Sequence, residues 1–455
     1  MTQPKHDSVS NLNRRDILRF GAAGLGAVLG GAALSGCAST PRHAGVAGRR
    51  WRATDHVRVG MVGIGGRSRS HIRDLLAIEG VEIRALCDLN EAHVAEAQQM
   101  IADAGRPRPV GYTRGPTDYL RMFEHEDLDI VYDATPWHLH TRIAVAAMEN
   151  GKHAAPEVPA AVTVEECWQL VEASERTGQH CIMLENVCYG REELMLINMV
   201  RKGIFGELLH GECGYLHDLR SLKFSDSGEG LWRLEPSIHR DGNLYPTHGL
   251  GPIAQYMNVN RGDCFDYLVS MSSKSRGLNL YAAEAFGPED PRATQKYALG
   301  DVNSTLIRTV AGCTIIVMHD TSTPRPYSRI NMIQGTRGLF KGYPDRIHIE
   351  GRSPGQDWED TDAYHEQFDH PLWTTLAEKA RGAGHGGMDY VMNHRLIHCL
   401  RTGEAPDMDV YDAAAWSVIS ELSERSVARR SAPQDVPDFT RGAWKTTPPL
   451  GIVTV

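Results

Sequence analysis

The sequence predicts an α/β protein in which an N-terminal doubly wound parallel sheet is followed by an α+β domain with a large, mostly antiparallel sheet. Three observations lead to this prediction. Buried-strand and helix patterns alternate over residues 55–180, a glycine cluster follows the first strand pattern, and short alternating segments with turn residues dominate beyond residue 180. Because 455 residues exceed what one compact core accommodates, two domains are expected.

The first part of the parallel sheet has the pattern of a Rossmann unit. An apolar strand pattern over 56–62 leads into the glycines, a helix pattern over 68–77 and a second strand pattern over 81–86. This order of elements, with an acidic residue after the second strand, is typical of dinucleotide binding. The cofactor-binding residues predicted in this stretch are Gly63, Gly65, Gly66, Arg67 and Asp88.

Each of these residues has a physical reason to be there. Gly63 permits a tight turn, and Gly65 lets the backbone approach a pyrophosphate at the start of the helix, where free N–H groups and the helix dipole favour an anion. Asp88 lies where a carboxylate accepts the adenosine ribose hydroxyls, so NAD is favoured over NADP. The third glycine of the motif is replaced by Ser68, which is still small.

The alternation continues with a strand over 128–135, a helix over about 139–149, and a further strand, helix and strand up to residue 180. Side chains that follow the strand ends are expected beside the nicotinamide half of the cofactor. They are Trp137, His138, His140, Glu157, Val158 and Asn186. A zinc site at the two histidines is rejected, because the sequence offers no third and fourth ligand at a suitable spacing.

Beyond this domain, strands alternate with turns, and helices are predicted near 192–206, 387–402 and 410–429. The polar stretch 350–372 is predicted as loop. The predicted organisation is a leader over 1–37, a linker over 38–54, the Rossmann domain over 55–180, a substrate domain over 181–440 and a tail over 441–455.

Composition excludes several classes of protein. The formal net charge is −9, whereas a general nucleic-acid binder needs a basic surface. The nine cysteines are scattered without a CxxC pair, so a zinc ribbon and a thioredoxin-like motif are not supported. No metal site is predicted.

The N-terminus has the layout of an export signal. Arg14 and Arg15 precede an apolar stretch rich in glycine and alanine that ends at Cys37. The paired arginines resemble a twin-arginine translocation signal, and the segment before Cys37 resembles a lipobox. We therefore expect the twin-arginine machinery to export the protein to the periplasm. Whether Cys37 becomes lipid-anchored or lies near a cleavage point stays open. Export of a folded enzyme with its cofactor predicts that the cofactor is tightly held.

The two-domain plan resembles the glucose–fructose oxidoreductase and inositol dehydrogenase superfamily. Many of its members carry Glu-Lys-Pro, with a proton-transferring lysine, where this chain has Glu157-Val158-Pro159. Several strings resemble a narrower family, the NAD-dependent glycosidases of glycoside hydrolase family 109, over about residues 55–440. These strings are "PWHLH", "PEVPAAVT", "ENVCY", "GELLHGECGYLHDLR", "YPTHGLGP" and "NRGDCFDYLVSMSSKSRGL".

This resemblance implies an α-N-acetylgalactosaminidase that oxidises C3 of the sugar with NAD, removes the C2 proton to expel the glycosidic oxygen, adds water and returns the hydride. Such a route is an exception to the two-carboxylate rule, and it needs groups that transfer protons. By the resemblance, His248 is the main acid/base, Tyr245 contacts both substrate and nicotinamide, and Tyr189 is a second proton-transfer candidate. The implied sugar-binding residues are Tyr215, Arg233, Tyr245, His248 and Tyr327.

Three hypotheses stay open from the sequence. The first is an exported exo-glycosidase for glycans with a terminal N-acetylhexosamine, of which α-linked N-acetylgalactosamine is favoured. The second is a secreted NAD(P)-dependent sugar oxidoreductase with net redox turnover. The third is a non-catalytic, lipid-anchored sugar-binding protein. The oligomeric state also stays open: in folds of this kind an exposed sheet face often pairs with a second copy, which would give a homodimer.

Overall fold

The computed structural model describes residues 45–455, which belong to one compact unit. The predicted export signal and Cys37 lie outside the described residues. Among residues 45–455, no helix combines the length and the apolar character that a membrane span requires.

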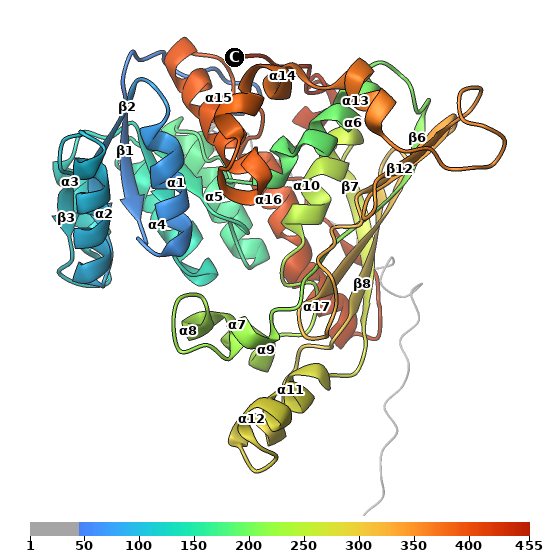
Figure 1. The fold of residues 1–455 in the computed structure, drawn as a ribbon, viewed down its shortest axis with the longest axis horizontal. Coiled ribbons are helices and arrows are strands. Elements are labelled where there is room, and N and C mark those ends of the chain that lie inside the picture. The colour runs from blue at the N-terminus through green and yellow to red at the C-terminus, as the bar shows by residue number, and fades with distance from the viewer. Residues whose placement is uncertain (1–44) are drawn as a thin grey trace, which may run out of the picture. The chain divides into compact units, whose positions relative to one another are not determined.

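The N-terminal sheet is parallel, with the strand order β3-β2-β1-β4-β5. Figure 1 labels β1, β2 and β3 of this sheet beside helices α1 to α5. Its strands are β1 (Val57–Val62), β2 (Val81–Cys87), β3 (Val110–Tyr112), β4 (Ile130–Asp133) and β5 (His153–Pro156). The helices of this domain are α1 (Gly66–Leu76), α2 (Glu91–Asp103), α3 (Asp118–His125), α4 (Trp137–Glu149) and α5 (Val164–Thr177). The order reverses at β1, so the loops after β1 and β4 form the crevice in which such sheets bind ligands.

Local sequence explains these elements. Five of the six β1 residues are buried, as a central parallel strand requires. Helix α1 buries Ser68, Ile72 and Leu75 at helical spacing. Helix α5 begins where the Thr163 side chain accepts a hydrogen bond from the Glu166 N–H, and it ends at Gly178 with a φ of 74°.

The second sheet has eight strands in the order β12-β11-β10-β6-β9-β8-β7-β13. Its strands are β6 (Leu208–Leu216), β7 (Phe265–Ser272), β8 (Asn303–Thr309), β9 (Thr314–Asp320), β10 (Met332–Gly335), β11 (Gly338–Lys341), β12 (Arg346–Ile349) and β13 (Gln434–Asp435). All neighbours pair antiparallel except β6 and β9, which pair parallel. The predicted fold class is thereby confirmed.

Helices cover one face of the second sheet (Figure 1), whereas its other face is exposed, as the alternating burial along β8 shows. In chain order, the helices before β6 and between β6 and β8 are η2 (Asn186–Tyr189), α6 (Arg191–Arg201), α7 (Arg220–Lys223), α8 (Gly230–Arg233), α9 (Glu235–His239), α10 (Thr247–Tyr256), α11 (Gly277–Phe286) and α12 (Pro291–Thr294). After β12 lie α13 (Asp362–Phe368), α14 (Pro371–Ala380), η3 (Gly384–Gly387), α15 (Met388–Thr402), α16 (Val410–Ser417), α17 (Ile419–Ala428) and η4 (Ala443–Lys445).

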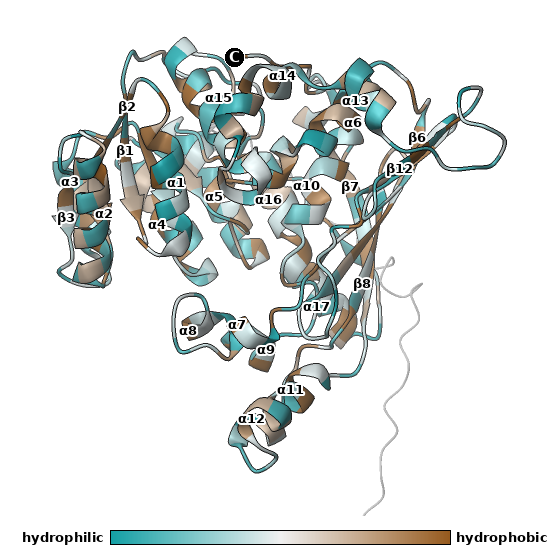
Figure 2. Ribbon diagram, in the orientation of Figure 1, coloured by the Kyte–Doolittle hydropathy of each residue, from teal (hydrophilic) through white to brown (hydrophobic). Residues whose placement is uncertain are grey.

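Three element predictions differ from the structure. The last strand predicted for the Rossmann domain is only an isolated bridge between Ala154 and Cys181. The loop predicted over 350–372 contains α13, which is mostly hydrophilic in Figure 2 but buries Tyr364 and Phe368 four residues apart. The single helix predicted over 410–429 is two helices, α16 and α17, which meet at Val418.

Candidate active site

A histidine–carboxylate pair lies at the start of α10. The His248 Nδ1 atom lies 2.6 Å from Oε1 of Glu185, whose side chain is fully buried. Because a carboxylate oxygen only accepts, Nδ1 donates this hydrogen bond, and in the neutral tautomer with this arrangement Nε2 is a hydrogen-bond acceptor. Nε2 lies 3.5 Å from the Tyr245 hydroxyl. The pair therefore presents one proton-accepting nitrogen beside one phenol.

Glycines let α10 reach this position. A Cβ atom on Gly249 would clash with the backbone of Gly214 in β6, with the Gly214 carbonyl oxygen 2.8 Å away. A Cβ atom on Gly251 would lie 3.1 Å from Cγ of Glu185. The segment that contains "YPTHGLG" is thus the first turn of a helix packed closely on β6 and on Glu185.

Aromatic rings enclose the pair. The Tyr245 ring centroid lies 4.5 Å from that of Tyr215 and 5.4 Å from that of Trp137. The Arg233 guanidinium lies 5.0 Å from the centroids of both Trp137 and Tyr245, and it forms an ion pair with Glu229. Aromatic faces pack against the C–H faces of a sugar while hydroxyl and guanidinium groups bind its oxygens. The arrangement suits a polar ring compound such as a sugar.

The two tyrosines remain protonated. Burial raises the pKa of Tyr245 well above its ordinary value, although the Arg233 charge opposes this. Burial likewise raises the pKa of Tyr215 to about 12. Both hydroxyls are therefore hydrogen-bond donors at neutral pH, and the Tyr215 hydroxyl lies 3.0 Å from Nδ1 of His217. Tyr327 lies beyond them, with its ring 5.0 Å from that of His217 and 6.1 Å from that of Tyr215.

The turn after β1 fits a dinucleotide. Gly63 has a φ of 79°, and a Cβ atom there would lie 2.9 Å from the Ala134 carbonyl oxygen. Cβ atoms on Gly65 and Gly66 would meet nothing within 4 Å, so the start of α1 is open. The Asp88 carboxylate is fixed by the backbone N–H groups of Ile64, at 2.5 Å, and Asn90, at 2.7 Å. A phosphate at α1 and a ribose at Asp88 match these positions.

Arg67 belongs to a buried charge network beside that turn. Its guanidinium contacts Oε1 of Glu157 at 2.5 Å and Oδ2 of Asp389 at 2.6 Å. Burial alone would raise the pKa of Glu157, but Arg67 and His71 lower it to about 2. Asn186 donates to the other oxygen of Asp389 at 2.6 Å. The predicted cofactor residues Arg67, Glu157 and Asn186 therefore meet in one network, which joins the glycine turn to α15.

Several predicted cofactor residues lie differently. Val158 is buried next to Glu157, while His138 is exposed in the first turn of α4. His140 is buried, with Nδ1 2.8 Å from the Pro159 carbonyl oxygen and Nε2 2.7 Å from that of Thr135. Its ring therefore ties two loops together instead of facing a ligand. Among residues 45–455, no group of three or more metal-binding side chains is assembled.

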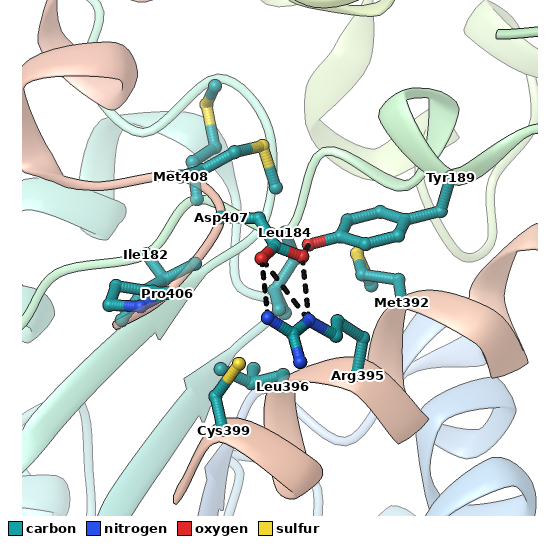
Figure 3. Close-up of a pocket in the computed structure, with 11 residues that line it drawn as sticks. Ile182, Leu184, Tyr189, Met392, Arg395, Leu396, Cys399, Pro406, Asp407 and Met408 are labelled. Carbon is teal, nitrogen blue, oxygen red and sulfur yellow. Dashed lines mark hydrogen bonds and ion pairs between the residues drawn. The ribbon is translucent and has the colours of Figure 1, made fainter. Parts of the chain in front are cut away.

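The structure does not bring Tyr189 to His248. The Tyr189 hydroxyl donates to Oδ2 of Asp407 at 3.1 Å, and Asp407 also binds Arg395 at 3.0 Å (Figure 3). Burial and the charge of Asp407 raise the pKa of Tyr189 well above its ordinary value. Its environment is a small cavity against α15, so a role in proton transfer at the sugar is not supported by its position.

Sequence reasoning missed three residues. Glu185 holds His248, and its only signal was its place directly before Asn186 in "ENVCY". Asp389 binds Arg67 and had no local motif. Lys223 lines a small cavity with Tyr245 and Arg233, and burial together with the Arg233 charge lowers its pKa to about 7.

Comparison with known proteins finds one family match for the domain with the glycine turn and another for the domain with His248. Residues 57–185 match the family described as "Oxidoreductase family, NAD-binding Rossmann fold". By class, therefore, this is a protein with an NAD-binding Rossmann domain. Residues 189–446 match "Glycosyl hydrolase 109, C-terminal domain". The chain belongs to glycosyl hydrolase family 109, as the sequence strings predicted.

Full-length relatives support the assignment. A "Glycosyl hydrolase family 109 protein" of Shewanella baltica (strain OS155) is 50% identical over 455 residues, which cover 97% of this chain and 99% of the relative. Another, from Shewanella sp. (strain W3-18-1), is 53% identical over 405 residues, which cover 88% of each chain. The protein is thus a family 109 glycosidase with an NAD-binding domain.

Solved structures share the fold at low identity. Levoglucosan dehydrogenase in complex with NADH and L-sorbose has a TM-score of 0.64 and 21% identity, with 85% of this chain and 100% of that chain covered. The WlbA dehydrogenase from Bordetella pertussis in complex with NADH and UDP-GlcNAcA has a TM-score of 0.58 and 17% identity, with 85% and 99% covered.

Proposed function

We propose that the enzyme hydrolyses terminal α-linked N-acetylgalactosamine residues and uses bound NAD without net redox change. The observation that carries this is the position of the His248–Glu185 pair. It lies among sugar-compatible aromatic rings, in a domain that follows an NAD-binding unit. When bound, NAD supplies a reversible hydride acceptor for C3 of the sugar.

The residues of this chain then have to move protons. His248 accepts a proton through Nε2, and Glu185 stabilises the imidazolium that results. Tyr245 and Tyr215, which stay protonated, donate hydrogen bonds to sugar oxygens and stabilise a developing oxyanion. A ketone at C3 acidifies the C2 proton, so its removal expels the glycosidic oxygen by elimination.

The dinucleotide would be held by the turn at Gly63, the open start of α1 and the Asp88 carboxylate. Asp88 favours NAD because it would repel a 2′-phosphate. Val158 carries no proton-transfer group where related oxidoreductases have a lysine. This absence supports a glycosidase over the alternative, a sugar oxidoreductase.

One assay separates the activities. Purified protein with p-nitrophenyl α-N-acetylgalactosaminide and no added redox partner should release nitrophenol without accumulating NADH. In D2O, the released sugar should carry deuterium at C2, because that proton leaves and returns. NADH accumulation without nitrophenol would indicate the oxidoreductase, and sugar binding without either product would indicate a non-catalytic binding protein. Nitrophenol release without label would refute the elimination route.

We also propose that the protein is exported by the twin-arginine machinery with NAD already bound. Arg14 and Arg15 and the apolar stretch before Cys37 support this. Mass spectrometry of the mature N-terminus should show loss of the leader, either with a diacylglyceryl Cys37 or with a cleaved end near it. An intact N-terminus on periplasmic material would contradict the proposal.

A further inference from the structure

Four tyrosines form a track that leads from the partly buried His248 to the surface. The ring centroids of Tyr245 and Tyr215 lie 4.5 Å apart, those of Tyr215 and Tyr327 6.1 Å, and those of Tyr327 and Tyr343 6.1 Å. The inner two rings are 7% exposed, whereas Tyr327 is 38% and Tyr343 is 40% exposed. Exposed neighbouring aromatic rings beside a binding pocket indicate a contact surface for a ligand.

Arg329 holds the outer two rings together. Its guanidinium lies 5.7 Å from the Tyr327 centroid and 5.6 Å from the Tyr343 centroid. It is anchored by Glu193 at 3.0 Å, a carboxylate that is only 2% exposed and that also accepts from Asn331 at 3.2 Å. The Arg329 Nη1 atom donates to the Tyr327 hydroxyl at 3.4 Å, which ties the guanidinium to the outer rings.

The backbone at this outer end is unusual. Ile330, Asn331 and Tyr343 have φ values of 64°, 46° and 57°, in the left-handed region that residues other than glycine rarely adopt. The Gly342 N–H bonds the carbonyl oxygens of Ile330 and Asn331 at 3.1 and 3.2 Å, which fastens the two segments to each other. Backbone held in such conformations by its surroundings clusters at active sites, ligand clamps and switch regions.

We propose that Tyr343 and Arg329, together with Tyr327, bind the sugar unit that leaves when the glycosidic bond breaks. The proposal rests on the proposed glycosidase activity. The terminal sugar takes the inner end of the track, at His248 and Tyr245, so the departing unit extends toward the exposed end. Two aromatic rings offer faces to a pyranose, and a guanidinium offers donors to its hydroxyls.

The test uses equilibrium binding in the His248→Ala background, where turnover does not interfere. The probes are α-N-acetylgalactosaminyl-galactose, methyl α-N-acetylgalactosaminide and an α-N-acetylgalactosaminyl-serine peptide, which differ only in the leaving unit. Tyr343→Ala should weaken binding of the disaccharide about tenfold and leave that of the methyl glycoside within twofold. Tyr343→Phe, which keeps the ring, should restore most of the disaccharide affinity.

Three results for Tyr343→Ala would overturn the proposal. Equal weakening for the disaccharide and the methyl glycoside would indicate a structural role, and unchanged binding of both would show that the ring makes no contact. Weakened binding of the α-N-acetylgalactosaminyl-serine peptide alone would assign the surface to a peptide. Failure of the proposed function is seen separately, as absence of nitrophenol release by the enzyme without substitutions.

Discussion

Replacing His248 with alanine should lower kcat/KM for p-nitrophenyl α-N-acetylgalactosaminide by about a thousandfold while bound NAD stays in place. The ring supplies the proton-accepting Nε2 next to Tyr245, and alanine has no substitute for it. The dinucleotide would be held elsewhere, at Gly63 and Asp88. NAD released on denaturation, measured per protein chain, and the rate of nitrophenol release are the two readouts.

The His248→Ala variant should remain folded, because alanine favours the helix in which the residue lies. His239→Ala is the control: that histidine lies in α9 with 66% of its side chain exposed, and its loss should leave the rate unchanged. If NAD were lost together with activity, His248 would lie on the cofactor side of the site and the assignment of its role would be wrong.

The Rossmann half of the protein could be predicted because its signals are local. Gly63, Gly65 and Asp88 lie on one strand–turn–helix–strand unit, and each residue type follows from the backbone or the hydrogen bond it must provide. The family strings also located Tyr215, Tyr245 and His248, which the structure brings within contact distance of one another.

The partners of these residues could not be predicted in the same way. Glu185 reaches His248 across 63 positions, and Arg67 reaches Asp389 across 322, so no local pattern connects them. The position of Tyr189, away from His248, has a geometric cause. In a 3₁₀ helix, residues three apart lie on the same side, so Tyr189 faces α15 together with Asn186, whereas Glu185 faces α10.

Replacing Glu185 with glutamine should lower kcat about a hundredfold with little change in KM. Glutamine keeps the size of the side chain but removes the negative charge that stabilises the imidazolium at 2.6 Å. Because Glu185 acts through His248, it is a positioning residue. A readout that separates this role from a structural one is therefore needed.

The double variant provides that readout. If Glu185 contributes only through His248, then Glu185→Gln should cause no further loss of rate once His248 is already alanine, so the two effects are strongly non-additive. Glu175→Gln is the matched control: this carboxylate is also buried but binds Arg441 and Tyr411, and its loss should leave kcat unchanged in both backgrounds. Additive losses in the double variant would show that Glu185 acts independently of His248, through packing or through its own contact with the sugar.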